Sequence, residues 1–410
     1  MAERIDVVVI GGGQAGLAAS HELTRAGVEH VVLERGRIGE TWRGRWNSFC
    51  LVTPNWTVQL PGYPYDGDDP DGFMPRDETV AYLELYAADF RAPLREGIEV
   101  TSLEITREGR LLLRTSGGDI RAESVVVGTG AYQRPHRPPG ASTLPPGLLQ
   151  IDVEDYRDPE ALPSGKVLVI GSGQSGCQIA EELLEAGREV FLACGRAPWA
   201  PRRLGDHDLL WWLIETGFLD APISALPTPA ARLAANILAT GHDGGHDLNL
   251  RTLRELGVTL LGHFVSADGR RARFAGDLGD SVAWGDERYR QFMDLVRKLV
   301  AERRLPLPDI REPVPFDGRA PQHLDLAGFG AVVFAGGFRP DYGTWVRVPG
   351  AVDELGFPIH SDGASTAAQG LYFVGVHFLR TRKSSLLYGV GEDATIVARQ
   401  IVSERRGGKR

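Results

Sequence analysis

Two short apolar runs in this chain each lead directly into a glycine-rich turn. Residues 6–10 precede a turn at residues 11–16, and residues 166–170 precede a turn at residues 171–176. A helical pattern of apolar and polar positions follows each turn. An apolar run that enters a tight turn and then a helix is typical of the start of a dinucleotide-binding unit. The pattern therefore predicts two such units, one at the start of the chain and one near its middle.

Both turns carry the spacing G-x-G-x-x-G. One copy of this motif is weak support, because glycine is common enough to reach that spacing by chance. Two copies, each between a buried strand and a helix, are specific, since free backbone N–H groups and the positive end of the helix dipole then face a pyrophosphate. The residues expected at the first nucleotide are Gly11, Gly13, Gln14, Ala15 and Gly16. Those expected at the second are Gly171, Ser172, Gly173, Gln174, Ser175 and Gly176.

The residues at the end of the second strand of each unit indicate that the two units bind different nucleotides. In the first unit this strand ends at Glu34, which is followed by Arg35. A carboxylate in this position accepts hydrogen bonds from ribose hydroxyls, which suits FAD or NAD. In the second unit the strand leads to Arg196, and no acid stands at its end. A cation holds the 2'-phosphate that a carboxylate would repel, so the second site is predicted to prefer NADPH.

Two further arginines, Arg202 and Arg203, follow the same strand. They can contribute to binding of the 2'-phosphate, or they can belong to a solvated turn with no role in binding. Both interpretations stay open at the level of the sequence.

Later strand-to-loop crossings indicate how the two units are connected. The run at residues 124–130 contains Gly128, and the proline-rich stretch behind it is interpreted as a stiff linker between domains. A matching run lies at residues 331–340, and a last strand at residues 371–375 ends in Gly375 before a closing helix. Because ligands bind at the carboxyl ends of parallel strands, Gly128 and Gly375 are expected near the first cofactor.

The simplest arrangement inserts the second domain into the first. An FAD-binding domain then comprises residues 1–150 and 336–410, and an NADPH-binding domain comprises residues 160–335. The predicted fold is α/β, with two Rossmann-like dinucleotide-binding domains of parallel strands flanked by helices. Residues 287–304 are predicted to form a helix that packs by one face. The aromatic run at residues 209–214 either fills a domain interface or lines a substrate passage.

Composition and charge narrow the range of partners. The formal net charge of −9 and a pI near 5.7 argue against nucleic acid and anionic membranes, which favour basic surfaces. No apolar run approaches the roughly twenty residues that cross a bilayer. Residues 1–6 lead directly into the first strand and leave no room for a signal peptide. A soluble, cytoplasmic protein is therefore expected.

Cysteine and histidine usage bears on electron transfer and on metals. Cys50, Cys177 and Cys194 form no C-x-x-C or similarly close pair, so the chain offers no redox-active disulfide to carry electrons away from a flavin. The histidines and cysteines also form no ligand cluster at zinc-like spacing. His242 and His246 are therefore interpreted as loop or capping residues, and no metal is expected.

Four further segments carry a resemblance to a known family. Together with the two glycine motifs, residues 39–46, 53–55, 60–64 and 337–341 resemble class B flavin-dependent monooxygenases of the short bacterial type, similar to flavin-containing monooxygenases. The resemblance implies FAD in the first domain and NADPH in the second. It further implies that O₂ is activated between them as a flavin C4a-(hydro)peroxide, which oxygenates nitrogen or sulfur, or a ketone, of a small-molecule substrate. The oligomeric state stays open, a homodimer being one alternative.

Several side chains in these segments are candidates for the flavin site. Thr41, Trp42 and Trp46 are expected at the flavin, where the two indole rings can stack on an isoalloxazine or can belong to a surface loop. By the resemblance, Asn55 is the catalytic candidate that holds the peroxide. The alternative is an asparagine that makes a turn beside a proline.

One segment departs from the family pattern. The fingerprint F-x-G-x-x-x-H-x-x-x-Y lies before the second glycine turn, and this chain has Pro146, Leu148, Asp152 and Tyr156 at its four defining positions. Only the tyrosine matches. The resemblance implies that the histidine couples NADPH binding to the chemistry of the flavin. Asp152 is therefore the second catalytic candidate, and it puts that coupling in doubt.

Four basic or titratable residues follow the last strand. His377, Arg380, Arg382 and Lys383 can face the flavin or an anionic substrate, or they can form an exposed basic loop.

Three functions are compatible with these features. The first is an NADPH-dependent flavin monooxygenase, which the motifs favour. The second is an FAD-containing NADPH reductase that passes electrons to a protein or a quinone. The third is a flavin-binding regulatory protein that senses redox state.

Overall fold

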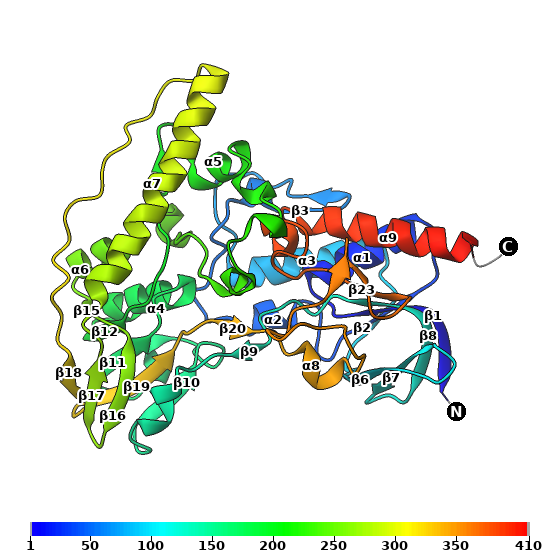
Figure 1. Cartoon of the computed structure of the whole chain (residues 1–410), viewed down its shortest axis with the longest axis horizontal. Helices are drawn as coiled ribbons and strands as arrows, with labels where there is room; N and C mark the ends of the chain where they lie inside the picture. The colour runs from blue at the N-terminus through cyan, green and yellow to red at the C-terminus, as the bar shows by residue number, and fades with distance from the viewer. Residues whose placement is uncertain (1, 408–410) are drawn as a thin grey trace.

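Two larger β-sheets organise the chain, and each is built around one of the glycine turns. Figure 1 shows the computed structural model, which describes residues 2–407. Both ends of the chain lie beside the first sheet, and the middle of the chain forms the second sheet. The predicted α/β fold with two dinucleotide-binding units is confirmed.

The first sheet has a parallel centre. β1 (Glu3–Ile10) lies between β2 (Val31–Leu33) and β8 (Ile120–Val127), and β23 (Leu371–Phe373) pairs with the other side of β8. β5 (Leu94–Arg95) pairs parallel with β2, and antiparallel strands complete the nine strands of the sheet. Those remaining are β6 (Val100–Ile105), β7 (Leu111–Thr115), β21 (His360–Ser361) and β22 (Ala364–Ser365). Residues 7–9 are fully buried, because layers cover the sheet on both faces.

Helices from both ends of the chain cover one face of this sheet. α1 (Gln14–Arg25) packs beside α9 (Val390–Gly407) and α3 (Arg76–Asp89), and their apolar side chains form one core with β1. The opposite face packs against β6, β7 and α8 (Tyr342–Trp345). Both faces of the sheet are therefore covered only when the last part of the chain packs against the first part.

The second sheet is entirely parallel, in the order β10-β19-β11-β12-β15. Its strands are β10 (Leu149–Asp152), β11 (Lys166–Ile170), β12 (Val190–Ala193), β15 (Thr259–Leu261) and β19 (Phe329–Phe334). α4 (Gln174–Glu185) and α6 (Leu250–Leu256) cover one face. The other face packs against a small antiparallel sheet of β16 (Phe264–Asp268), β17 (Arg271–Phe274) and β18 (His323–Asp325).

The structure corrects two expectations about the connection between the sheets. β10 belongs to the second sheet, so this sheet begins at Leu149 rather than near residue 160. The proline-rich stretch is not a free linker, since the short helix η2 (Pro139–Thr143) contacts β16 and Ala141 is buried there. The two segments that connect the sheets also contact each other, because β9 (Arg134–Pro135) pairs antiparallel with β20 (Phe338–Arg339).

A third layer of helices lies above the second sheet. α7 (Leu278–Arg303) begins earlier than expected and packs by one face, while Leu295 on its other side is 36% exposed. It buries α5 (Leu209–Glu215), and the same cluster includes Val52 from the first part of the chain. The aromatic run therefore fills an interface between the two halves of the molecule, the first half being built around the first sheet and the second half around the second sheet. Other short elements are α2 (Glu40–Arg43), β3 (Gln59–Leu60), β4 (Tyr63–Pro64), β13 (Arg203–Leu204) and β14 (His207–Asp208).

Within residues 2–407, no helix combines the length and the apolar character needed to cross a bilayer.

Arg202 is buried and joins the two halves. It is therefore neither a ligand of a 2'-phosphate nor part of a solvated turn, the two interpretations that the sequence left open. Its side chain is 2% exposed and lies 2.7 Å from the carboxylate of Asp208. The guanidinium also donates to the carbonyl of Val52 (2.8 Å) and lies over the ring of Phe73, 4.4 Å from its centroid. A cation enclosed in this way is committed to the fold, because removing it would leave Asp208 buried and unpaired.

We expect Arg202→Ala to destabilise the protein by about 3–5 kcal/mol, the usual penalty for leaving one member of a buried ion pair alone. Urea unfolding followed by circular dichroism measures the change. Arg319→Ala is the matched control, since its pair with Asp317 is on the surface and its side chain is 91% exposed. An equal shift of the unfolding midpoint in the two variants would show that Arg202 does not hold the halves together.

Candidate functional site

The first glycine turn is packed backbone against backbone. Gly11 adopts φ +110°, a conformation that favours glycine, and its N–H donates to the carbonyl of Leu33 (2.8 Å). A Cβ on Gly16 would lie 1.8 Å from the carbonyl oxygen of Gly11, and one on Gly128 would lie 2.9 Å from the backbone of Gly16. Only glycine fits here, so β1, β8 and the start of α1 approach one another without intervening side chains.

Gly13 differs from these glycines because the space beside it is open. No atom lies within 4 Å of the position that a Cβ would take. Gly13 is also the N-cap of α1, and no side chain hydrogen-bonds to the exposed N–H groups of that helix end. A helix N-terminus with free N–H groups and no side chain in front of it suits the close approach of a pyrophosphate. The turn therefore fits the dinucleotide that the sequence predicts.

Glu34 is held at the end of β2, next to this turn. Its carboxylate is 8% exposed and accepts hydrogen bonds from the N–H groups of Gly12 (2.6 Å) and Gly36 (2.9 Å). The neighbouring Arg35 is exposed. These bonds orient the carboxylate at the edge of the turn, where a ribose would lie beside the pyrophosphate.

The second glycine turn repeats this geometry. Gly171 adopts φ +114°, and a Cβ there would lie 2.4 Å from the carbonyl oxygen of Ala335. A Cβ on Gly176 would lie 1.9 Å from the carbonyl oxygen of Gly171. Gly173 caps α4 without a side-chain hydrogen bond, as Gly13 caps α1. The two turns thus share one backbone geometry at the carboxyl edges of the two sheets, although Ala235 lies 3.8 Å from the Cβ position of Gly173, where the first turn is open.

In the second unit the bond between turn and strand end comes from the turn, where Ser172 stands at the position of Gly12 in the first unit. The hydroxyl of Ser172 is buried, accepts from the N–H of Gly195 (2.9 Å) and donates to the carbonyl of the same residue (3.1 Å). The next residue, Arg196, is exposed, and its guanidinium has no hydrogen-bond or ion-pair partner in the part of the chain that the structure describes. Arg203, at the start of β13, is exposed as well. A cation is therefore available at the ribose end of the second unit.

Each helix that follows a glycine turn begins with a glutamine that holds a distant segment. Gln14 accepts from the indole N–H of Trp42 (3.0 Å) and donates to the carbonyl of Ser385 (3.3 Å). Gln174 accepts from the N–H of Ala239 (3.1 Å) and donates to the carbonyl of the same residue. Both glutamines thus position the segments that border the nucleotide sites. Gly375 adds to the first border, since a Cβ there would lie 2.2 Å from that of Ala15.

Segments from each half reach into the other half. Trp46 is 2% exposed and packs edge-on against Phe49, in the core cluster of the second sheet. Leu233 packs against the core of the first sheet, and Arg232 pairs there with Asp353 (3.2 Å). The expected stacking of Trp46 on a flavin is not what this structure presents, because the ring is enclosed by protein. Trp42 is partly buried, and Thr41 is exposed.

An aromatic and cationic cluster lies where the carboxyl edge of the first sheet meets β20. The ring of Tyr132 stacks on His377, with centroids 5.2 Å apart, and lies 5.9 Å from that of Phe338. Burial lowers the pKa of His377 to about 4, so its ring is neutral near pH 7. Its Nδ1 and the Nε of Arg45 are both buried without a hydrogen-bond partner. Buried polar atoms of this kind require a partner, and a bound group can supply it.

Asn55 and Asp152, the two catalytic candidates, are both engaged within the protein. The amide of Asn55 donates to the carbonyl of Asp69 (2.9 Å) and accepts from the N–H of Met74 (2.8 Å), so it fastens a loop. Asp152 receives two hydrogen bonds of 2.8 Å from Arg137. Neither side chain belongs to the cluster around His377.

The basic residues after the last strand do not form an exposed loop. Arg380 pairs with Asp393 of α9 (2.9 Å), and Lys383 is buried between Asp220 (2.7 Å) and Glu392 (2.5 Å). Arg382 lies over the ring of Phe218, 4.1 Å from its centroid. These cations are occupied by neighbours that folding brings to them.

Comparison with known proteins identifies the family. The profile of the pyridine nucleotide-disulphide oxidoreductases matches residues 8–212. A CzcO-like oxidoreductase of Geobacillus kaustophilus is 31% identical over 402 residues, which cover 97% of this chain and 99% of that protein. The chain belongs to the pyridine nucleotide-disulphide oxidoreductase family.

Other proteins are similar to this chain over part of the sequence or in fold. Flavin-containing monooxygenase 1 of Mus musculus is 28% identical over 250 residues, 54% of this chain and 46% of that protein. A flavin-containing monooxygenase from Stenotrophomonas maltophilia has the same fold, with a TM-score of 0.69, 21% identity and coverage of 98% and 99% of the two chains. A bacillithiol disulfide reductase from Staphylococcus aureus also shares the fold, with a TM-score of 0.63, 12% identity and coverage of 98% and 99%.

The resemblance that the motifs carry is thus confirmed, and this pyridine nucleotide-disulphide oxidoreductase is a flavin-dependent oxidoreductase. Members of the family bind FAD and NADP(H). No motif in the sequence marks Tyr132, although it follows the strand-to-loop crossing at Gly128, where ligands are expected. Nothing in the sequence indicated that Leu233 reaches the first sheet, since no motif marks that segment.

Proposed function

We propose that this protein is an NADPH-dependent FAD monooxygenase that uses O₂ to oxygenate nitrogen, sulfur or a ketone in a small molecule. The observation that carries the proposal is the state of the cysteines in a chain with two nucleotide turns. Cys50, Cys177 and Cys194 are all free thiols, and the latter two are buried in the core cluster beside the second sheet. Without a disulfide to relay electrons, a reduced flavin can pass them only to O₂ or to an external acceptor. The flavin-containing monooxygenases among its relatives favour O₂.

The first glycine turn is the proposed FAD site. The N–H groups at the start of α1 would hold the pyrophosphate in the open space at Gly13, and Glu34 would hold the ribose. When bound, FAD supplies hydride transfer and the activation of O₂. The side chains around His377 then have a limited task. Neutral His377 and the free Nε of Arg45 can hydrogen-bond a group at the junction, and the ring of Tyr132 stacks on His377 beside them.

The second glycine turn is the proposed NADPH site. Gly173 and the start of α4 would hold the pyrophosphate, and exposed Arg196 would bind the 2'-phosphate at the end of β12. Arg203 is a second cation for the same group.

We expect Gly13→Val to fold normally but to lose the flavin. The backbone at Gly13 is extended (φ −89°, ψ −175°) and space for the side chain is open, so the fold tolerates valine while the pyrophosphate does not. The absorbance ratio of flavin to protein, together with circular dichroism, measures both effects. Gly16→Ala is the contrasting variant, and it should fail to fold because its methyl group meets the Gly11 carbonyl. A yellow Gly13→Val protein would contradict the assignment.

We expect Arg196→Glu to raise the dissociation constant for NADPH by roughly 10- to 100-fold, since hydrogen bonds to charged groups are worth about 1.5–3 kcal/mol. NADH lacks the 2'-phosphate and should bind nearly as before. Titration of the oxidised flavoprotein with each nucleotide gives both constants. Arg270→Glu, an exposed cation between β16 and β17, is the control and should change neither constant. Equal losses for the two nucleotides in Arg196→Glu would refute the 2'-phosphate assignment.

The monooxygenase reaction itself is tested with isotopically labelled O₂. Purified flavoprotein, NADPH and a panel of small amines, sulfides and ketones should give a product that carries one labelled oxygen atom, and NADPH consumption should match product. Omission of O₂ should abolish the product. Hydrogen peroxide as the sole oxygen product across the panel would count against the proposal.

The second candidate is an NADPH reductase for a protein or quinone. The observation that favours it is the ion pair of Asp152 with Arg137 at the position of the fingerprint histidine. Fast reduction of a quinone by NADPH without O₂, and no oxygenated product in the labelling experiment, would establish this function instead.

A further inference from the structure

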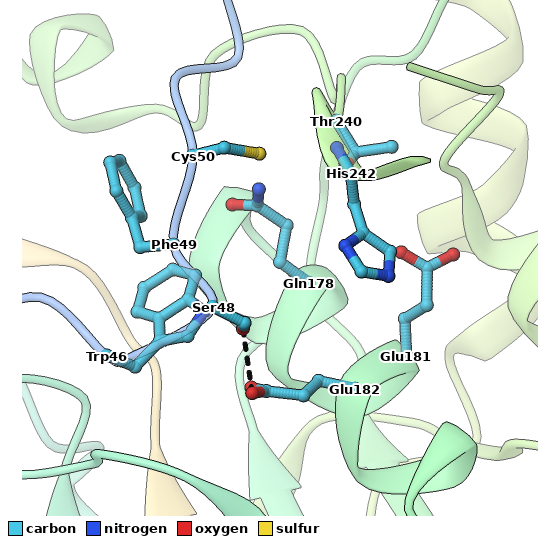
Figure 2. A pocket seen from close by; sticks show the side chains of 9 residues that line it. All are labelled: Trp46, Ser48, Phe49, Cys50, Gln178, Glu181, Glu182, Thr240 and His242. Carbon is cyan, nitrogen blue, oxygen red and sulfur yellow. Dashed lines mark hydrogen bonds between the residues drawn. The ribbon is translucent and has the colours of Figure 1, made fainter. Parts of the chain in front are cut away.

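A histidine-rich segment of the second half is fastened to one face of α4. The imidazole of His246 lies 2.7 Å from the carboxylate of Glu181, and that of His242 lies 3.2 Å from the carboxylate of Glu185, one helical turn further along. These histidines are therefore not merely loop or capping residues. The sequence concealed this arrangement because the glutamates lie far from the histidines along the chain. Figure 2 shows His242 next to Glu181 beside a small cavity, whereas Glu182 on the same helix is hydrogen-bonded to Ser48.

The charge around these histidines is not balanced. Four carboxylates gather here, those of Glu181, Glu182, Glu185 and Asp243. Across residues 2–407, no lysine or arginine lies within ion-pair distance of any of them, and only the two imidazoles do. The hydrogen bond with Glu181 raises the pKa of His246, so this imidazole can offset one carboxylate, but the carboxylates outnumber the imidazoles. The cluster therefore has an excess of negative charge that a divalent cation would offset.

The side chains have the chemistry and the spacing of a metal site. The ligand atoms of Glu185, His242 and Asp243 all lie within 4.8 Å of one another, and the His242 Nε2 is 3.7 Å from the Asp243 carboxylate. An ion at the centre would need ligands at about 2.0–2.2 Å, which these exposed side chains can reach by rotation. One imidazole nitrogen with two carboxylates suits Zn²⁺ and similar ions, and solvent completes the tetrahedron.

We propose that Glu185, His242 and Asp243 form a site for a divalent transition-metal ion of the Zn²⁺ type. Its ligands come from α4 and from the segment that passes over it, so the ion would link the two. The same segment is held at the start of α4, where Gln174 binds Ala239. The His246–Glu181 pair lies beside the site and supports the segment from the protein side. The cavity next to His242 has a volume of about 20 Å³, room for one water molecule, and Cys50 lines it.

The site can be tested without regard to the flavin reaction. The metal-free full-length protein is titrated with Zn²⁺ in competition with a chromophoric zinc indicator, and the fit gives the number of sites and the affinity. We expect one saturable site. His242→Ala and Glu185→Gln should each weaken it by at least about tenfold, since even outer-shell partners of a ligand are worth 10–100-fold in affinity. All three ligands are at least partly exposed, so these variants should keep the wild-type urea midpoint.

His263→Ala is the matched control. His263 forms another surface pair with a carboxylate, that of Asp277 at 2.6 Å, far from this cluster in the sequence. Its loss should leave Zn²⁺ binding unchanged. Cys50→Ser should also bind Zn²⁺ as the wild type does, because the thiol is not among the proposed ligands.

The absorption spectrum of the Co²⁺-loaded protein gives a second readout. A tetrahedral site of one nitrogen and oxygen ligands should produce visible bands that disappear in His242→Ala. Absence of saturable binding in the wild type, equal affinity in His242→Ala, or loss of binding in Cys50→Ser would each overturn the proposed ligand set.

Discussion

The contact between backbone atoms at the two glycine turns is the constraint on which the rest of the structure depends. Gly16 and Gly176 bring the first helix of each unit against the turn that precedes it, at distances that exclude even a methyl group. This contact sets the angle at which α1 and α4 leave their sheets, and it aims their free N–H groups at the carboxyl edges. The groups that border each site, such as Glu34 and Ser172, then hydrogen-bond to the turn or to the next strand end. Anion binding is therefore a property of the fold before any side chain contributes.

The two halves exchange segments as well as chain connections. Trp46 from the first half is enclosed in the core of the second, Leu233 from the second half packs on the core of the first, and Arg202 bonds across the boundary. Each anchor removes apolar or charged surface from water, so separating the halves would expose it. The cluster around Tyr132 and His377 lies at the same boundary. The two buried nitrogen atoms without a partner in this cluster are the Nδ1 of the neutral His377 and the Nε of Arg45.

One fold serves proteins with different activities, since a flavin-containing monooxygenase and a bacillithiol disulfide reductase both resemble this chain in fold. Fold similarity alone cannot choose between them, because function resides in the site rather than in the scaffold. In this chain the separating feature is the absence of a disulfide among the described residues, where all three cysteines are free. The chain also differs from the family fingerprint at Asp152, which is paired with Arg137 where that pattern has a histidine.

The sequence by itself determined the two nucleotide units, the difference between their strand ends and the family resemblance. Each of these features is local: an apolar run, a glycine spacing and a helix occupy a few dozen consecutive residues, and backbone sterics at Gly11 or Gly171 act within that span. Only the tertiary structure decided which polar side chains are buried and which partners they bind. Arg202 became a buried anchor, Lys383 was enclosed by Asp220 and Glu392, and His242 and His246 met the glutamates of α4. A charged or aromatic side chain can equally be solvated, buried or bound to a ligand, and the choice depends on partners distant in sequence that only folding places beside it.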